Sequence, residues 1–184
     1  MLTQNEKEKI EQIFSSRAQI TPIPVVNSRN QAPAPPSKIF QLQRMANNYT
    51  LLPTDPNSIT TPFLDGAFLF VILSSDPARI YCGTPNYRSE FVIEGHTSLS
   101  YRADVLYAGE LFFRHGELEK WTNGSGHYQP SAALRQTNLI PYLQLLLPAE
   151  KFVDQWNTTS SEAKQRLWDR GYAMLDSGSS SSGN

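Results

Sequence analysis

Cysteine is nearly absent from this chain, because Cys82 is the only one among 184 residues. A single cysteine excludes an intrachain disulfide and a zinc site built from several cysteines. This usage fits a reducing compartment, or a protein that reaches one. Since Cys82 lies in an apolar stretch, we interpret it as a small buried hydrophobic residue. The alternative is a nucleophile activated by His96 or His127.

Long apolar runs are missing as well. The longest stretch, residues 67–73, is far too short to cross a bilayer as a helix, so we predict no membrane span. The first residues carry charges of both signs and no hydrophobic region, so we predict no Sec signal peptide. We therefore expect the chain to leave the cell by a route that needs no signal peptide, or otherwise to be cytoplasmic.

A strongly basic region is the third feature that the chain lacks. The net charge is −1, and charges of both signs are spread along the sequence. Contacts to phosphate dominate the binding of nucleic acids, and they require a basic face. We therefore predict no nucleic-acid partner, and we expect a monomer.

Motifs for metals and nucleotides are also absent. The chain has three histidines, His96, His115 and His127, but His115 falls in a predicted turn that is remote from the loop of His127. No metal site is therefore predicted. The chain contains no Walker loop, no Rossmann glycine fingerprint and no Gly-x-Ser-x-Gly elbow.

The length suits one domain with flexible ends. We divide the chain into an N-terminal helix (1–18), a Pro-rich linker or surface arm (19–62), an α+β domain (63–175) and a disordered Ser/Gly tail (176–184). The arm holds eight of the 13 prolines, which lack the amide proton that helices and sheets need. A short helix around residues 38–47 is an option within it, and binding to a partner domain is an alternative role for its prolines.

Several segments have the composition of β-strands. Residues 67–74 are almost wholly apolar and predict a central buried strand. Residues 76–79, with Pro77 second, predict a turn into a strand over 80–82, and residues 89–94 predict a third strand. Residues 104–130 predict a β-hairpin that turns at Gly116 and runs into a polar loop.

The C-terminal third has helical patterns. Ser131 is a suitable cap for a helix, and Pro141 should kink that helix or divide it. A last helix begins near Thr159. With these helices and short connections between strands, we predict an α+β fold. It consists of an antiparallel sheet of four to five strands with helices packed on one face.

Two polar segments are candidates for a site. Residues 95–99 place His96 beside Ser98 in a predicted strand-end loop, where an imidazole can act as a base near neutral pH. Residues 122–130 bring Ser125, His127 and Tyr128 together beside Gly124 and Gly126, and backbone amides in such a loop can bind an anion. The alternative is a rigid turn whose polar groups satisfy one another.

Glu110 is the best candidate for a catalytic acid. It is the one charge in the otherwise uncharged stretch 105–113, so its carboxylate must be paired, near an edge or in a cleft. Arg102 is the partner closest in sequence. We expect Glu110 and His127 to be catalytic, and we expect the ligand-binding residues to be His96, Ser98, Ser125 and Tyr128.

Taken together, these segments resemble a pattern in uncharacterised bacterial domains. The pattern is His-Ser-Ser, a strand with Ala-Gly-Glu, a glycine turn and Ser-Gly-His-Tyr-x-Pro. Here it reads His96-Thr-Ser, Ala108-Gly-Glu110, Gly116 and Ser125-Gly-His-Tyr-Gln-Pro130, and it covers about residues 65–148. Such domains are similar to C-terminal modules of secreted toxins and effectors. The Ser-rich tail resembles the translocation signals of type IV effectors.

The resemblance implies a bacterial effector or toxin-like enzyme that transfers ADP-ribose from NAD to a protein or other macromolecule of a host or target cell. A His, a Tyr and a Glu on a small sheet are similar to the residues of one class of ADP-ribosyltransferases, which use NAD. Their order along the chain does not match that class cleanly, because Glu110 precedes His127 and Tyr128 here. The other hypothesis is a non-enzymatic protein-binding module. An enzyme is favoured if Glu110 and the His127 loop open into one cleft, and a module if their polar groups are hydrogen-bonded internally.

Overall fold

The computed structural model describes residues 20–45 and 48–156 of the chain. The predicted N-terminal helix, the last helix and the Ser/Gly tail lie outside the described residues. The elements in chain order are η1 (Pro36–Lys38), β1 (Phe40–Met45), β2 (Asn48–Pro53), β3 (Gly66–Leu73), β4 (Asp76–Gly83), α2 (His96–Ser100), β5 (Val105–Arg114), β6 (Glu117–Thr122), α3 (Leu134–Asn138), α4 (Pro141–Leu146), η2 (Ala149–Lys151) and β7 (Phe152–Val153).

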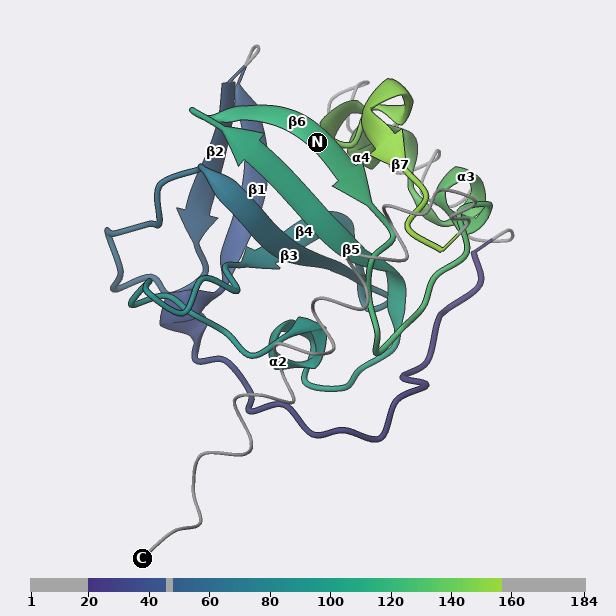
Figure 1. The fold of residues 1–184 in the computed structure, drawn as a ribbon, viewed down its shortest axis with the longest axis horizontal. Helices are drawn as coiled ribbons and strands as arrows, with labels where there is room; N and C mark the ends of the chain where they lie inside the picture. The colour runs from purple at the N-terminus through teal and green to yellow at the C-terminus, as the bar shows by residue number, and fades with distance from the viewer. Residues whose placement is uncertain (1–19, 46–47, 157–184) are drawn as a thin grey trace, which may run out of the picture.

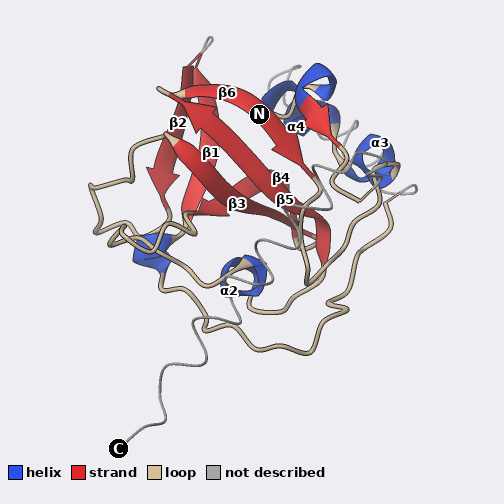
Figure 2. Ribbon diagram, viewed as in Figure 1, coloured by secondary structure: helices blue, strands red, loops and turns tan. Residues whose placement is uncertain are grey.

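One seven-stranded sheet forms the body of the molecule (Figure 1). Its strands lie in the order β2-β1-β4-β3-β5-β6-β7. Neighbouring strands are antiparallel except for β6 and β7, which are parallel, so the sheet is mixed. The sheet curves into a half-barrel, and the helices beside it are short (Figure 2).

The predicted fold class is therefore wrong in its strands and in the place of its helices. Two of the additional strands, β1 and β2, come from the Pro-rich segment, because prolines are absent between Pro36 and Pro53 and the backbone there is free to pair. Strand β1 also replaces the short helix considered for residues 38–47. In the described part of the chain the α-helices are no longer than six residues.

Helices lie on both faces of the sheet because β3 and β5 are apolar on both faces. Phe68, Phe70 and Ile72 of β3 point into a core that α4 covers. Leu69 and Val71, which alternate with them, point into a second core that α2 and residues 20–35 cover. A strand that is apolar on both sides needs a cover on each face, so helices on one face alone would not suffice.

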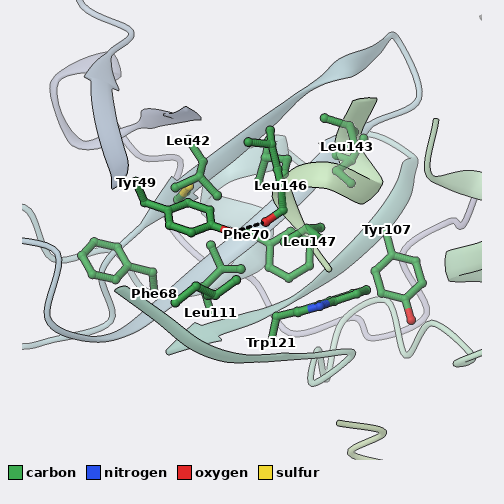
Figure 3. Close-up of a cluster of buried hydrophobic side chains, with 14 of the residues drawn as sticks. Leu42, Tyr49, Phe68, Phe70, Tyr107, Leu111, Trp121, Leu143, Leu146 and Leu147 are labelled. Carbon is green, nitrogen blue, oxygen red and sulfur yellow. Dashed lines mark hydrogen bonds between the residues drawn. The ribbon is translucent and has the colours of Figure 1, made fainter. Parts of the chain in front are cut away.

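The larger core lies between the sheet and α4 (Figure 3). Trp121 packs edge-on against Phe70 and Tyr107, with ring centroids 6.3 and 6.0 Å apart. The hydroxyl of Tyr49 donates a hydrogen bond of 2.9 Å to the carbonyl of Leu146, and this bond ties the edge strand β2 to α4. The aromatic layer therefore joins both ends of the curved sheet.

The predicted hairpin is confirmed. Strands β5 and β6 pair antiparallel, and the turn between them consists of His115 and Gly116, with φ values of 51° and 83°. Positive φ at both central residues matches the twist of a hairpin, which is why glycine suits the second position. The effect predicted for Pro141 is also confirmed, because it begins α4 after α3 has ended.

Three local predictions are wrong. The turn before β4 lies at residues 74–75, and β4 already begins at Asp76. Residues 89–94 form a loop, in which Val92 makes an isolated bridge to Thr84. Residues 96–100 form helix α2 rather than a loop. Each of these errors follows from reading short polar segments without their distant partners.

Gly109, in the middle of β5, has no room for a side chain. A Cβ atom there would lie 1.9 Å from the carbonyl oxygen of Thr122 and 3.0 Å from the ring of Phe70. Strand β6 can therefore approach β5 closely at this point only because residue 109 is glycine.

We predict that Gly109→Ala lowers the free energy of unfolding by about 3 kcal/mol or more, because a backbone atom of β6 must move. Urea denaturation followed by tryptophan fluorescence measures this change. The matched control is Gly126→Ala, where a Cβ meets no atom within 4 Å. Equal stabilities of the two variants would contradict the close contact.

Candidate functional site

His96 begins α2 and points at the sheet. Its Nε2 lies 2.8 Å from the carbonyl oxygen of Gly109, so the neutral ring donates a hydrogen bond to β5. Burial lowers the pKa of His96 from 6.5 to about 4, and the neighbouring His127 acts in the same direction against the Gly109 carbonyl. The imidazole is therefore neutral at physiological pH, and its proton is used to hold α2 on β5.

Tyr128 is buried with its hydroxyl between two partners. The hydroxyl donates to the carbonyl of Ala103 at 2.6 Å, so the hydroxyl of Ser100, also 2.6 Å away, must donate to it. Burial raises the pKa of Tyr128, so the phenol is protonated at neutral pH. Through these two bonds Tyr128 fastens the polar loop of residues 123–130 to the end of α2.

His127 is directed at the N-terminal part of the chain. Its Nε2 donates to the carbonyl of Arg29 at 2.8 Å, and its own carbonyl accepts from the amide of Val26 at 2.8 Å. The guanidinium of Arg102 donates to the carbonyls of Asn27 and Arg29, both at 3.3 Å. His127 and Arg102 therefore hold one stretch of backbone between them.

Glu110 is 5% exposed in the middle of β5. Its cross-strand neighbours are Leu69 and Thr122, and the Thr122 hydroxyl donates to its Oε2 at 3.5 Å. A Cβ atom on Gly124 would lie 2.9 Å from the same oxygen. The glycine that follows β6 thus leaves room for the carboxylate at the start of the polar loop.

The hydroxyls of Ser98 and Ser125 are buried and make no hydrogen bond within the described residues. A buried hydroxyl without a partner costs about 1–3 kcal/mol, so each is a donor available to a bound group.

All six predicted site residues are thus buried, and the structure brings them to α2, to β5 and to the 123–130 loop. Three surface pockets lie elsewhere: between α4 and β6, beside the β5–β6 turn and around Phe63. None of the six residues lines any of these three pockets. Most of the polar atoms are turned inward, toward other parts of the fold.

Sequence reasoning missed three polar residues that hold the region together. The amide of Asn138 binds the backbone of Thr21 on both its N–H and its C=O, at 3.0 and 2.8 Å, and also donates to Leu106. Ser100 supports Tyr128, and Gln31 joins the arm to α2. No local signal distinguishes Asn138, which ends the mostly polar helix α3, or Gln31.

Other kinds of site find little support in residues 20–45 and 48–156. No three His, Cys, Asp or Glu side chains in this part of the chain are placed to hold a metal ion. No helix of the same residues is long and apolar enough to cross a membrane. Cys82 lies within the larger core, and burial raises the pKa of its thiol well above the usual range, which opposes a nucleophilic role.

Comparisons with protein-family profiles, with curated proteins and with solved structures found no match for this chain.

The buried neutral His96 predicts a loss of stability in acid. Between pH 6.5 and about 4 the unfolded chain binds a proton at His96 that the folded chain does not. The stabilisation is complete above pH 6.5 and is lost as the pH falls through this window. We expect it to account for about 2 kcal/mol between about pH 7 and about pH 5.

Urea denaturation at both pH values measures this loss. His96→Gln keeps a donor for the Gly109 carbonyl and cannot titrate, so it should remove that part of the pH dependence. His115→Asn, at an exposed turn residue with φ of 51°, is the control and should leave it unchanged. A loss of stability between the two pH values that is as large in His96→Gln as in the wild-type chain would contradict the burial of a neutral imidazole.

Proposed function

We propose that the chain is a non-enzymatic protein-binding module whose polar motif holds the fold and fixes an extended segment on its surface. The observation that carries the proposal is the direction of the hydrogen bonds. His96 binds β5, Tyr128 binds the end of α2, and His127 binds the backbone of residue 29. Polar side chains used in this way build a rigid face rather than an open reaction cleft.

The face is made of α2 and the 123–130 loop, and in this chain residues 21–34 lie across it (Figure 1). Backbone groups of Ile23 pair with Val105 at the start of β5, in an antiparallel bridge. Further along, Val26 binds His127 and Ala34 binds Ser98, both through backbone atoms. Main-chain hydrogen bonds of this kind are how many domains bind extended polypeptides.

The sequence supports a partner and a location for the proposed module. The resemblance to modules of secreted toxins and effectors supports a protein of a host or target cell as the partner. It also supports export by a type IV or other route that needs no signal peptide. The net charge of −1 supports the proposal that no nucleic acid takes part. In this proposal the module acts as a monomer.

A second candidate is an ADP-ribosyltransferase that uses NAD as its substrate. A specific observation favours it: Glu110 is buried, and the buried hydroxyls of Ser98 and Ser125 make no hydrogen bond within residues 20–45 and 48–156. Glu110 would stabilise positive charge on the ribose as the bond to nicotinamide breaks and the target nucleophile bonds to the same carbon. His96 or His127, with Tyr128, would position the nucleotide.

The two candidates differ in how the protein behaves with NAD. The module predicts no heat of NAD binding by calorimetry and no ADP-ribose adduct by mass spectrometry after incubation with NAD and a cell lysate. Glu110→Gln, His127→Ala and the exposed control Glu117→Gln should then all give the same blank result. NAD turnover that Glu110→Gln abolishes, while Glu117→Gln and the thermal unfolding transition are unchanged, would establish the transferase instead.

A further inference from the structure

The side chain of Gln31 enters a slot at the start of α2. Its Oε1 accepts hydrogen bonds from the backbone N–H of Thr97 at 3.0 Å and from the Thr97 hydroxyl at 2.7 Å. Its Nε2 donates to the carbonyl of Glu94 at 3.3 Å. Acceptor and donor of one primary amide are thus both bound, and a carboxylate or an apolar side chain could not reproduce the pattern.

Gly95 forms the floor of this slot. A Cβ atom at residue 95 would lie 1.9 Å from the Nε2 of Gln31. The φ of Gly95 is 169°, an extended value that any residue can adopt, so the backbone does not require a glycine here. The absence of a side chain at residue 95 is explained by the space that the Gln31 amide takes up.

The segment that follows Gln31 is bound mainly by its backbone. The amide of Ala32 donates to a carboxylate oxygen of Glu94 at 2.7 Å, and the amide of Ala34 donates to the carbonyl of Ser98 at 3.0 Å. The carbonyl of Ala34 accepts from the hydroxyl of Tyr101 at 2.6 Å. The methyl group of Ala34 is buried in the smaller core, which leaves room for a small side chain only.

Most of the N-terminal part of the arm, residues 21–34, is nevertheless outside the core. Residues 26–30 and residues 32 and 33 are exposed, and the buried positions on either side of them are Ile23 and Ala34. A segment with few buried side chains and many main-chain hydrogen bonds resembles a bound peptide more than a structural strand. Its prolines favour the extended conformation, which lowers the entropy lost on binding.

Resting on the binding-module function proposed above, we propose that this face is a binding track for a partner protein's extended segment of the form Gln-x-Pro-small. In this structure the chain's own Gln31-Ala-Pro-Ala34 occupies the binding track, in the place that the partner's segment would take. The Gln31 slot and the small Ala34 site are the two positions that determine specificity. A tethered arm has a high effective concentration, on the order of millimolar, so a partner must compete with it.

The test uses the full chain with its own arm weakened. Gln31→Ala combined with Ala34→Asp removes the amide from the slot and places a charge against the small apolar site. A fluorescent peptide of residues 27–36 is then titrated, and its anisotropy is followed. We expect it to bind this variant at least about tenfold more tightly than the wild-type chain, in which the arm competes.

Substitutions in the peptide and in the track test the specificity. A peptide carrying Gln31→Glu should bind the variant chain at least about tenfold more weakly, because Glu cannot donate to the Glu94 carbonyl and adds a like charge. Gly95→Ala, added to the variant chain, should abolish binding by filling the slot. Glu117→Gln, at an exposed residue at the start of β6 and outside this face, is the control and should bind the peptide normally.

Four results would overturn the proposal. The first is that the peptide does not bind the arm-weakened chain. The second is that the Gln31→Glu peptide binds as tightly as the unchanged peptide, and the third is that Gly95→Ala leaves the binding of the peptide undiminished. The fourth is loss of the thermal unfolding transition in the arm-weakened chain, which would make the arm part of the core. A wild-type dimer in sedimentation velocity that Gln31→Ala dissociates would replace the partner by a second copy of this chain. NAD turnover, in contrast, would contradict the function and leave the peptide result standing.

Discussion

The structure depends on the close approach of three elements at Gly109. At this residue β5 has no side chain, the carbonyl of Thr122 in β6 comes close, and the carbonyl of Gly109 itself accepts from His96 in α2. The contact is polar, and it lies in the middle of a strand that is buried on both faces. Unpaired polar groups are costly there, so the position of α2 is determined within narrow limits.

Different elements cover the two faces of the sheet around this contact. On one face, α2 is held by His96 and Tyr128, and with the 123–130 loop it forms the surface on which residues 21–34 lie. On the other face, β3 and β5 present aromatic side chains to α4. The polar motif therefore determines how one face of a hydrophobic sheet is covered, and the cover is partly an extended chain instead of a long helix.

The features that the sequence predicted correctly are local ones. The hairpin turn at His115 and Gly116 and the break at Pro141 depend on backbone preferences of single residues. Strands β1 and β2 form a local hairpin that the interpretation of the segment as a Pro-rich arm overlooked, and only the pairing of β1 with β4 joins distant parts of the chain. The apolar residues on both faces of β3 did carry a signal for two covered faces, which the prediction of helices on one face overlooked.

For the candidate site, too, only the local features could be predicted from the sequence. Its residue types could be read from the sequence, and the structure places them around α2, β5 and one loop. Their partners could not be read, because His96 binds a carbonyl 13 residues away and His127 binds one 98 residues away. The role of Gln31 depends wholly on such distant contacts, with Thr97 66 residues away, so no nearby pattern indicates it.

Hydrogen–deuterium exchange of the wild-type chain tests most directly whether the arm is a bound ligand of this face. The amides of Val26, Ala32 and Ala34 are hydrogen-bonded to the face, whereas those of β5 lie in the core of the sheet. The account predicts that the arm amides exchange through local opening, at least about a hundredfold faster than the β5 amides. Equal protection of both sets would contradict it, because the arm would then open only when the whole domain unfolds.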